Sequence, residues 1–198
     1  MGFLTLLKAD LVDAGALFRE ALTLAQRIED QIGSGWALAG LARLASRVGD
    51  HAHARALHRE SLAIFRQQGD RRSIAYTLLN LGNVAICLDD LAETRASFRE
   101  SLIISRRLGD LQAITVSLEG MAEVACLQSQ PSRAIPLISA ASFLRKNASL
   151  PRSPADGEKM DQAIMSAREA LGEAAFCAAW DAGQALTLEQ AVEYALSL

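Results

Sequence analysis

The chain has 198 residues, a formal net charge of -3 and a sequence pI near 5.6. Hydrophobic residues make up 51% of it, only 4 residues are proline, and no β-branched run alternates with polar residues, so the composition favours helices. The basic residues are spread out and the apolar runs are short, which argues against both a nucleic-acid surface and a membrane span. The N-terminus lacks a basic leader and a cleavage site, and the 3 cysteines show no CxxC spacing, so we expect a cytoplasmic protein with reduced thiols.

A 40-residue repeat organises most of the chain. Residues 51–90 align on residues 91–130 without a gap, with 15 identities in 40 positions. Such a repeat decides the architecture before any local pattern does. Each repeat holds two stretches of helical periodicity, and aspartate stands at every twentieth position from 10 to 110.

These aspartates predict the turns. Glycine directly precedes Asp50, Asp70 and Asp110, where it can close one helix in the left-handed conformation. The aspartate can then cap the next helix, and Asp90 with Glu93 resembles a capping box. Helices of about 17 residues joined by such short turns pack antiparallel, so the chain is predicted to be a series of helical hairpins.

Residues 1–147 form the predicted hairpin array, with complete hairpins at about 31–67, 71–107 and 111–146. By the 40-residue register, residues 1–7 correspond to the second half of a helix whose first half is missing. A repeat array cut in this way exposes an apolar face. Two explanations stay open: the chain is a fragment of a longer protein, or it forms a homodimer through this N-terminal edge.

The hairpin interior resembles the tetratricopeptide (TPR) signature of large and small residues. The third repeat carries the pattern at Leu78, Leu81, Gly82 and Ala85 in its first helix, and at Thr94, Phe98, Ser101 and Leu102 in its second. The resemblance implies an all-α, right-handed α-α superhelix that binds proteins or peptides through the concave groove lined by the first helix of each hairpin. The period is 40 instead of the family's 34, so the helices are longer.

After residue 127 the repeat fails. Gln130-Pro131 replaces the glycine-aspartate turn, and Pro136 predicts that the following helix starts late or kinks. Residues 148–157 are predicted to be a linker, and residues 158–198 a C-terminal helical cap. Helical stretches are expected at roughly 157–171, 173–182 and 188–197, with Thr187 and Gln190 at the start of the last.

The segments 170–180 and 183–192 are similar to the C-terminal end of large bacterial signal-transduction regulators with TPR-like arrays, including LuxR-family and ATPase-containing transcriptional regulators. This resemblance implies a regulatory, signal-transducing role in bacteria. The ATPase and DNA-binding or catalytic modules of such proteins are not in this sequence, so their activities do not transfer.

The candidate binding residues are those of the predicted groove. They are Trp36, Arg43, Arg47, Tyr76, Asn80, Asn83, Glu119 and Glu123. An extended peptide could contact the aromatic residues and hydrogen-bond to the asparagines, along a charge gradient from arginine to glutamate. The alternative is that Trp36 and Tyr76 pack between neighbouring hairpins.

No catalytic, cofactor-binding or metal-binding constellation is found. The histidines at 51 and 53 point apart on a helix, and His58 takes the interior position that Phe18 and Phe98 hold in the neighbouring repeats. We therefore expect a non-enzymatic protein- or peptide-binding regulatory module without a cofactor or metal, and without nucleic-acid or membrane contact. The alternatives are an effector sensor for a small molecule or signalling peptide and a structural oligomerisation scaffold.

Overall fold

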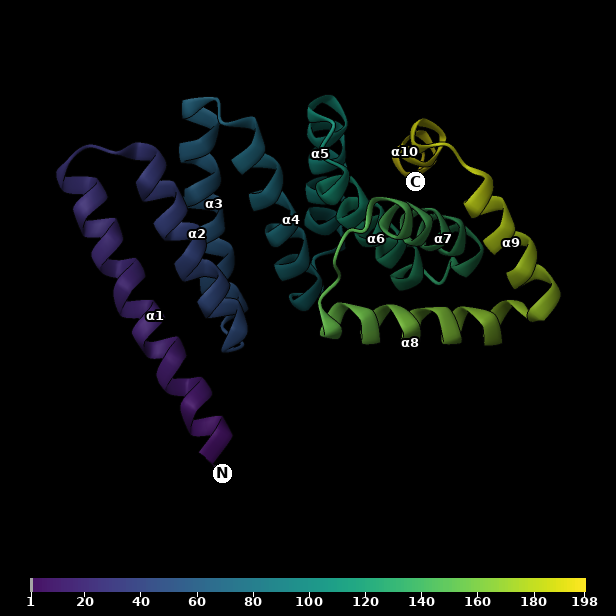
Figure 1. Ribbon diagram of the computed structural model, residues 1–198, viewed down its shortest axis with the longest axis horizontal. Coiled ribbons are helices and arrows are strands. Elements are labelled where there is room, and N and C mark those ends of the chain that lie inside the picture. The colour runs from purple at the N-terminus through teal and green to yellow at the C-terminus, as the bar shows by residue number, and fades with distance from the viewer. Residues whose placement is uncertain (1) are drawn as a thin grey trace. The chain divides into compact units, whose positions relative to one another are not determined.

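The computed structural model describes the backbone of residues 2–198 and the side chains of residues 13–198. Within that part there are ten helices and no strand (Figure 1), which confirms the all-α prediction. The helices are α1 (Gly2–Arg27), α2 (Gln31–Arg47), α3 (His51–Gln68), α4 (Arg71–Cys87), α5 (Leu91–Leu108), α6 (Leu111–Leu127), α7 (Pro131–Ala148), α8 (Pro154–Leu171), α9 (Glu173–Ala185) and α10 (Leu188–Leu196). None of these helices is long and apolar enough to cross a membrane.

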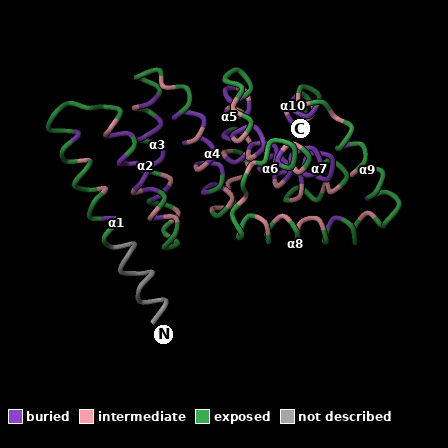
Figure 2. The backbone as a smooth tube through the Cα atoms, in the orientation of Figure 1, coloured by how far each residue is buried: buried purple, intermediate pink, exposed green. Residues whose placement is uncertain are grey.

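The chain forms two compact units, residues 1–93 and residues 94–198. In the first unit, α1 packs on α2, α2 on α3 and α3 on α4, and α2 also contacts α4 directly. In the second unit, α7 contacts α6, α8 and α9, while α10 rests on both α6 and α7. The C-terminal helices therefore share a core with the last hairpin, and Figure 2 shows this burial along α6 and α7.

The predicted turns form as expected. Gly49, Gly69 and Gly109 all have positive φ, between 67° and 85°. The carboxylates of Asp50, Asp70 and Asp110 accept hydrogen bonds from the backbone N–H three residues on, at 3.1 Å in each case. Each aspartate thereby satisfies one of the unpaired N–H groups at a helix start and lies at its positive end.

The first predicted turn does not form. α1 runs from Gly2 to Arg27 as one helix, so Asp10 lies inside it and residues 1–7 are not a separate helix. The residue before Asp10 is Ala9, whereas glycine precedes the aspartates that cap helices α3, α4 and α6. The turns before Asp30 and Asp90 form at the polar residues Glu29 and Asp89, with φ of 57° and 54°. Alanine favours the helix interior and disfavours the left-handed conformation, so α1 continues through Ala9. The side chains of residues 1–12 lie outside the described part, and with them most of the edge expected to mediate a homodimer.

The capping box expected at Asp90 forms only in part. The carboxylate of Asp90 accepts the backbone N–H of Glu93 at 3.0 Å, but the Glu93 side chain pairs with Arg59 of α3 instead of returning to the helix start. A complete box forms where Thr187 and Gln190 predicted a helix start, with reciprocal hydrogen bonds of 2.9 and 3.2 Å.

Helices extend further into the C-terminal region than expected. α7 begins at Pro131 and passes through Pro136, since a proline so near the helix start removes only one hydrogen bond, to the carbonyl of the exposed Ser132. α8 begins at Pro154, where Ser153 caps it. The segment between the two helices is therefore residues 149–153, about half of the predicted linker.

At two places an aromatic ring of one hairpin packs against a glycine of the next. A Cβ atom added to Gly120 would lie 2.5 Å from the ring of Phe98, and one added to Gly40 would lie 2.7 Å from Cζ of Phe18. Phe98 is fully buried, so α6 must approach α5 closely at this position. The 40-residue register places His58 and Asn80 at the corresponding positions of the middle repeat.

His58 is as buried as the interior position predicted, at 1% exposure. Burial, and secondarily the positive charge of Arg43, lowers the pKa of His58 from 6.5 to about 4. The imidazole is therefore neutral in the folded protein at neutral pH.

We expect the folded protein to lose stability as the pH falls from 6.5 to 4. In that window the unfolded chain binds a proton at His58 that the folded chain does not, so the free energy of unfolding falls by roughly 3 kcal/mol. Urea titrations at pH 7 and pH 4.5 measure this loss. The His58→Phe/Asn80→Gly variant reproduces the aromatic-glycine pairing of the other repeats and serves as the control. If it loses as much stability as the unmodified chain, His58 is not the responsible group.

Candidate functional site

The eight predicted groove residues lie on α2, α4 and α6, the first helices of the three predicted hairpins. Six of them, on α2 and α4, belong to the first unit, and Glu119 and Glu123 on α6 belong to the second. Each set lies within its own unit, and the two sets differ in their contacts.

Trp36 on α2 both packs and faces solvent. Its ring meets the ring of Phe65 edge to face at a centroid distance of 5.4 Å, and Phe65 is fully buried. At the same time 52% of Trp36 remains exposed. One edge of the indole is thus held by the hairpin interior while the rest is open, an arrangement that holds an aromatic side chain in place for contact with a partner.

The other predicted residues of the first unit are polar or charged and lie on the same two helices. Arg43 and Arg47 on α2 and Asn83 on α4 are exposed, while Tyr76 and Asn80 are half-buried. Helices α2 and α4 contact each other directly. We call the predicted residues on these two helices the α2–α4 face, defined by Trp36, Arg43, Arg47, Tyr76, Asn80 and Asn83.

Glu119 is the centre of a buried ion cluster. Its carboxylate accepts two hydrogen bonds from Arg145 of α7, at 2.7 and 2.8 Å, and a third from Arg152. Arg145 is only 8% exposed and also donates to the carbonyl of Pro151 at 2.6 Å. This bidentate geometry is the strong form of an arginine-carboxylate pair. Glu119 therefore fastens residues 149–153 to α6 and α7.

Glu123, one turn further along α6, pairs with Lys159 of α8 at 2.5 Å. Lys159 is 58% exposed, so this second pair is close to solvent. Both acidic residues predicted for the groove are thus engaged by the C-terminal part of the chain itself.

The sequence reasoning missed Arg145, Arg152 and Lys159. One signal was available: the 40-residue register places Arg145 where Phe65 and Ser105 stand in earlier repeats, and both of these are fully buried. A charge at an interior position requires a partner. That partner is Glu119, which the register does not single out, whereas Arg152 and Lys159 lie outside the repeat altogether.

Comparisons with known proteins agree with this architecture. Residues 1–67 match one model of the tetratricopeptide repeat, and residues 74–108 match a second. The crystal structure of BtubC (BKLC) from P. vanneervenii is similar in fold, with a TM-score of 0.73 and 22% sequence identity. That likeness covers 89% of this chain and 73% of the other. No curated protein matches the chain.

Proposed function

This chain carries a tetratricopeptide-like repeat array, and from that premise we propose that it is a non-catalytic module that binds a protein or peptide through the α2–α4 face. The observation that carries the proposal is the half-exposed ring of Trp36, held by Phe65 on the same helix as the exposed Arg43 and Arg47. Tryptophan and arginine are the residues that most often dominate binding energy at protein interfaces.

The face indicates the chemistry of its partner. Arg43 and Arg47 stand one turn apart on α2 and give it positive charge. Asn83 on the adjacent α4 offers an amide that can hydrogen-bond to an extended backbone. We therefore propose that the partner is an acidic, extended peptide segment with at least one apolar side chain that contacts Trp36.

Glu119 and Glu123 are not part of this face, since Arg145, Arg152 and Lys159 already pair with them.

The regulatory role that the C-terminal segments 170–180 and 183–192 suggest remains part of the proposal. Binding of a partner peptide to the array would then bias an output module joined to it, as in the bacterial regulators that these segments resemble.

Charge reversal on the α2–α4 face tests the proposal. Acidic peptides selected from a random library on the full chain should lose roughly 10- to 100-fold in affinity when Arg43 and Arg47 are both replaced by glutamate, because charge-assisted hydrogen bonds contribute about 1.5–3 kcal/mol. Isothermal titration calorimetry measures the loss, and the melting temperature should not change because both side chains are exposed.

Arg27→Glu is the matched control, since Arg27 is an exposed arginine in the last turn of α1 and not on this face. It should leave the affinity unchanged. Selected peptides that bind the Arg43→Glu/Arg47→Glu variant as tightly as the unmodified chain would place the binding surface elsewhere.

A further inference from the structure

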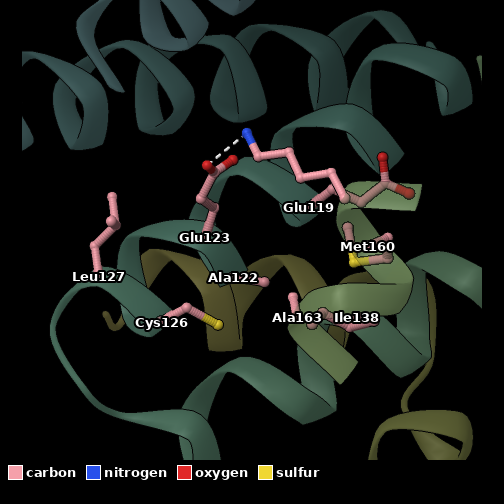
Figure 3. Close-up of a pocket in the computed structure, with 9 residues that line it drawn as sticks. Glu119, Ala122, Glu123, Cys126, Leu127, Ile138, Met160 and Ala163 are labelled. Atoms are coloured by element: carbon pink, nitrogen blue, oxygen red, sulfur yellow. Dashed lines mark ion pairs between the residues drawn. The ribbon is translucent and has the colours of Figure 1, made fainter. Parts of the chain in front are cut away.

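A cavity of about 250 Å³ lies in the second unit, where α8 passes over α6 and α7 (Figure 3). Helix α6 contributes most of its lining, α7 one residue and α8 the rest. The lining residues are Glu119, Ala122, Glu123, Cys126, Leu127, Ile138, Lys159, Met160 and Ala163.

Helix α8 packs incompletely against α6 and α7 around the cavity. Of the residues of α8, only Ala167 is fully buried. Ala122 of α6 and Ala163 of α8, which both line the space, have short side chains and leave it unfilled. Leu127 and Lys159 at its margin are more than half exposed, so the space is a pocket that opens to solvent on one side.

The interior of the cavity is apolar. Ile138, Leu127 and Met160 contribute hydrocarbon and thioether surface. Burial, with a smaller contribution from Glu123, raises the pKa of the Cys126 thiol, so this group is uncharged at neutral pH. An apolar space of this kind holds water poorly and takes apolar guests instead.

Every charged group that lines the cavity already has a partner. Glu119 is held by Arg145 and Arg152, and Glu123 by Lys159, the pair drawn as a dashed line in Figure 3. A charged ligand would have to break one of these pairs to be neutralised. An uncharged ligand would leave all of them intact.

We propose that the cavity between α6, α7 and α8 binds a small, uncharged, largely apolar molecule of one or two rings. A cavity of about 150 Å³ with aliphatic walls takes benzene, so one of 250 Å³ has room for a bicyclic molecule such as indole. Its occupant contacts α6 and α8 together and thus holds α8 in place. The proposal does not depend on the α2–α4 face, which belongs to the other unit.

Three probes of equal ring size test the proposal on the full chain: indole, indole-3-acetate and tryptamine. Indole should bind saturably with a dissociation constant on the order of 0.1–1 mM, as measured by titration calorimetry. The anionic and cationic analogues should bind about fivefold more weakly, because each must disturb an ion pair. Indole should also slow the alkylation of Cys126 in a Cys87→Ser/Cys177→Ser background.

Ala163→Leu fills the cavity from α8 and should abolish indole binding without lowering the melting temperature. Ala170→Leu, at an exposed position of the same helix, should leave binding intact. Cys126→Leu fills the space from α6, and its loss of indole binding serves as the test if Ala163→Leu proves unstable. The proposal is overturned if indole does not bind saturably, if binding survives both filling variants, or if a charged analogue binds more tightly.

Discussion

Replacing Glu119 with alanine should lower the free energy of unfolding by about 3–5 kcal/mol, the usual cost of removing one partner of a buried ion pair. The substitution leaves Arg145, 8% exposed, without the carboxylate that accepts two of its hydrogen bonds. It also releases Arg152 of the connecting segment. Urea denaturation followed by circular dichroism measures the change.

Glu123→Ala is the matched control for this experiment. Glu123 lies on the same helix and was assigned to the same predicted groove, but its partner Lys159 is largely exposed. Its loss should therefore cost about 0–1 kcal/mol. A Glu119→Leu/Arg145→Leu double variant should recover most of the stability lost in Glu119→Ala, since an apolar pair can replace a buried ion pair. Equal effects of Glu119→Ala and Glu123→Ala would contradict the buried cluster.

Gly183→Ala should lower the free energy of unfolding by about 3 kcal/mol, although alanine is the better helix former by up to about 1 kcal/mol. Gly183 lies on α9 where this helix contacts α7. A Cβ atom there would lie 2.8 Å from Cα of Pro136 and 2.7 Å from Cβ of Ser139, with the carbonyl oxygen of Pro136 closer still. Backbone atoms cannot turn away as a side chain can, so α9 must move off α7.

The displacement of α9 has its own spectroscopic signal. The hydroxyl of Ser139 donates to the carbonyl of Trp180 at 2.7 Å, and the Trp180 ring stacks on Phe176. In a Trp36→Phe background, the fluorescence of Trp180 should shift to longer wavelength in Gly183→Ala. Gln184→Ala, at the exposed neighbouring position, should change neither stability nor emission. An unshifted Gly183→Ala spectrum with wild-type stability would contradict the close contact of α7 and α9.

The features that the sequence predicted well are local in the chain. The caps at Asp50, Asp70 and Asp110 and the burial of Phe98, Leu102 and His58 follow from short-range patterns, a turn signal or a 3.6-residue period. The errors were local as well. No turn forms at Asp10, which Ala9 precedes, and α8 begins at Pro154 inside the predicted linker because proline can also begin a helix.

The sequence by itself therefore determined a helical repeat, its turns and its buried positions, because each 40-residue unit carries the information for its own hairpin. Only the tertiary structure decided which positions of the repeat remain open. Trp36, Arg43 and Arg47 stay accessible, whereas Glu119 is bound by Arg145 and Arg152, 26 and 33 residues away. Arg152 lies beyond the last hairpin and so has no counterpart in the repeat. The ion pair between Arg152 and Glu119 depends on how the segment before α8 folds back on α6, which no periodic pattern encodes.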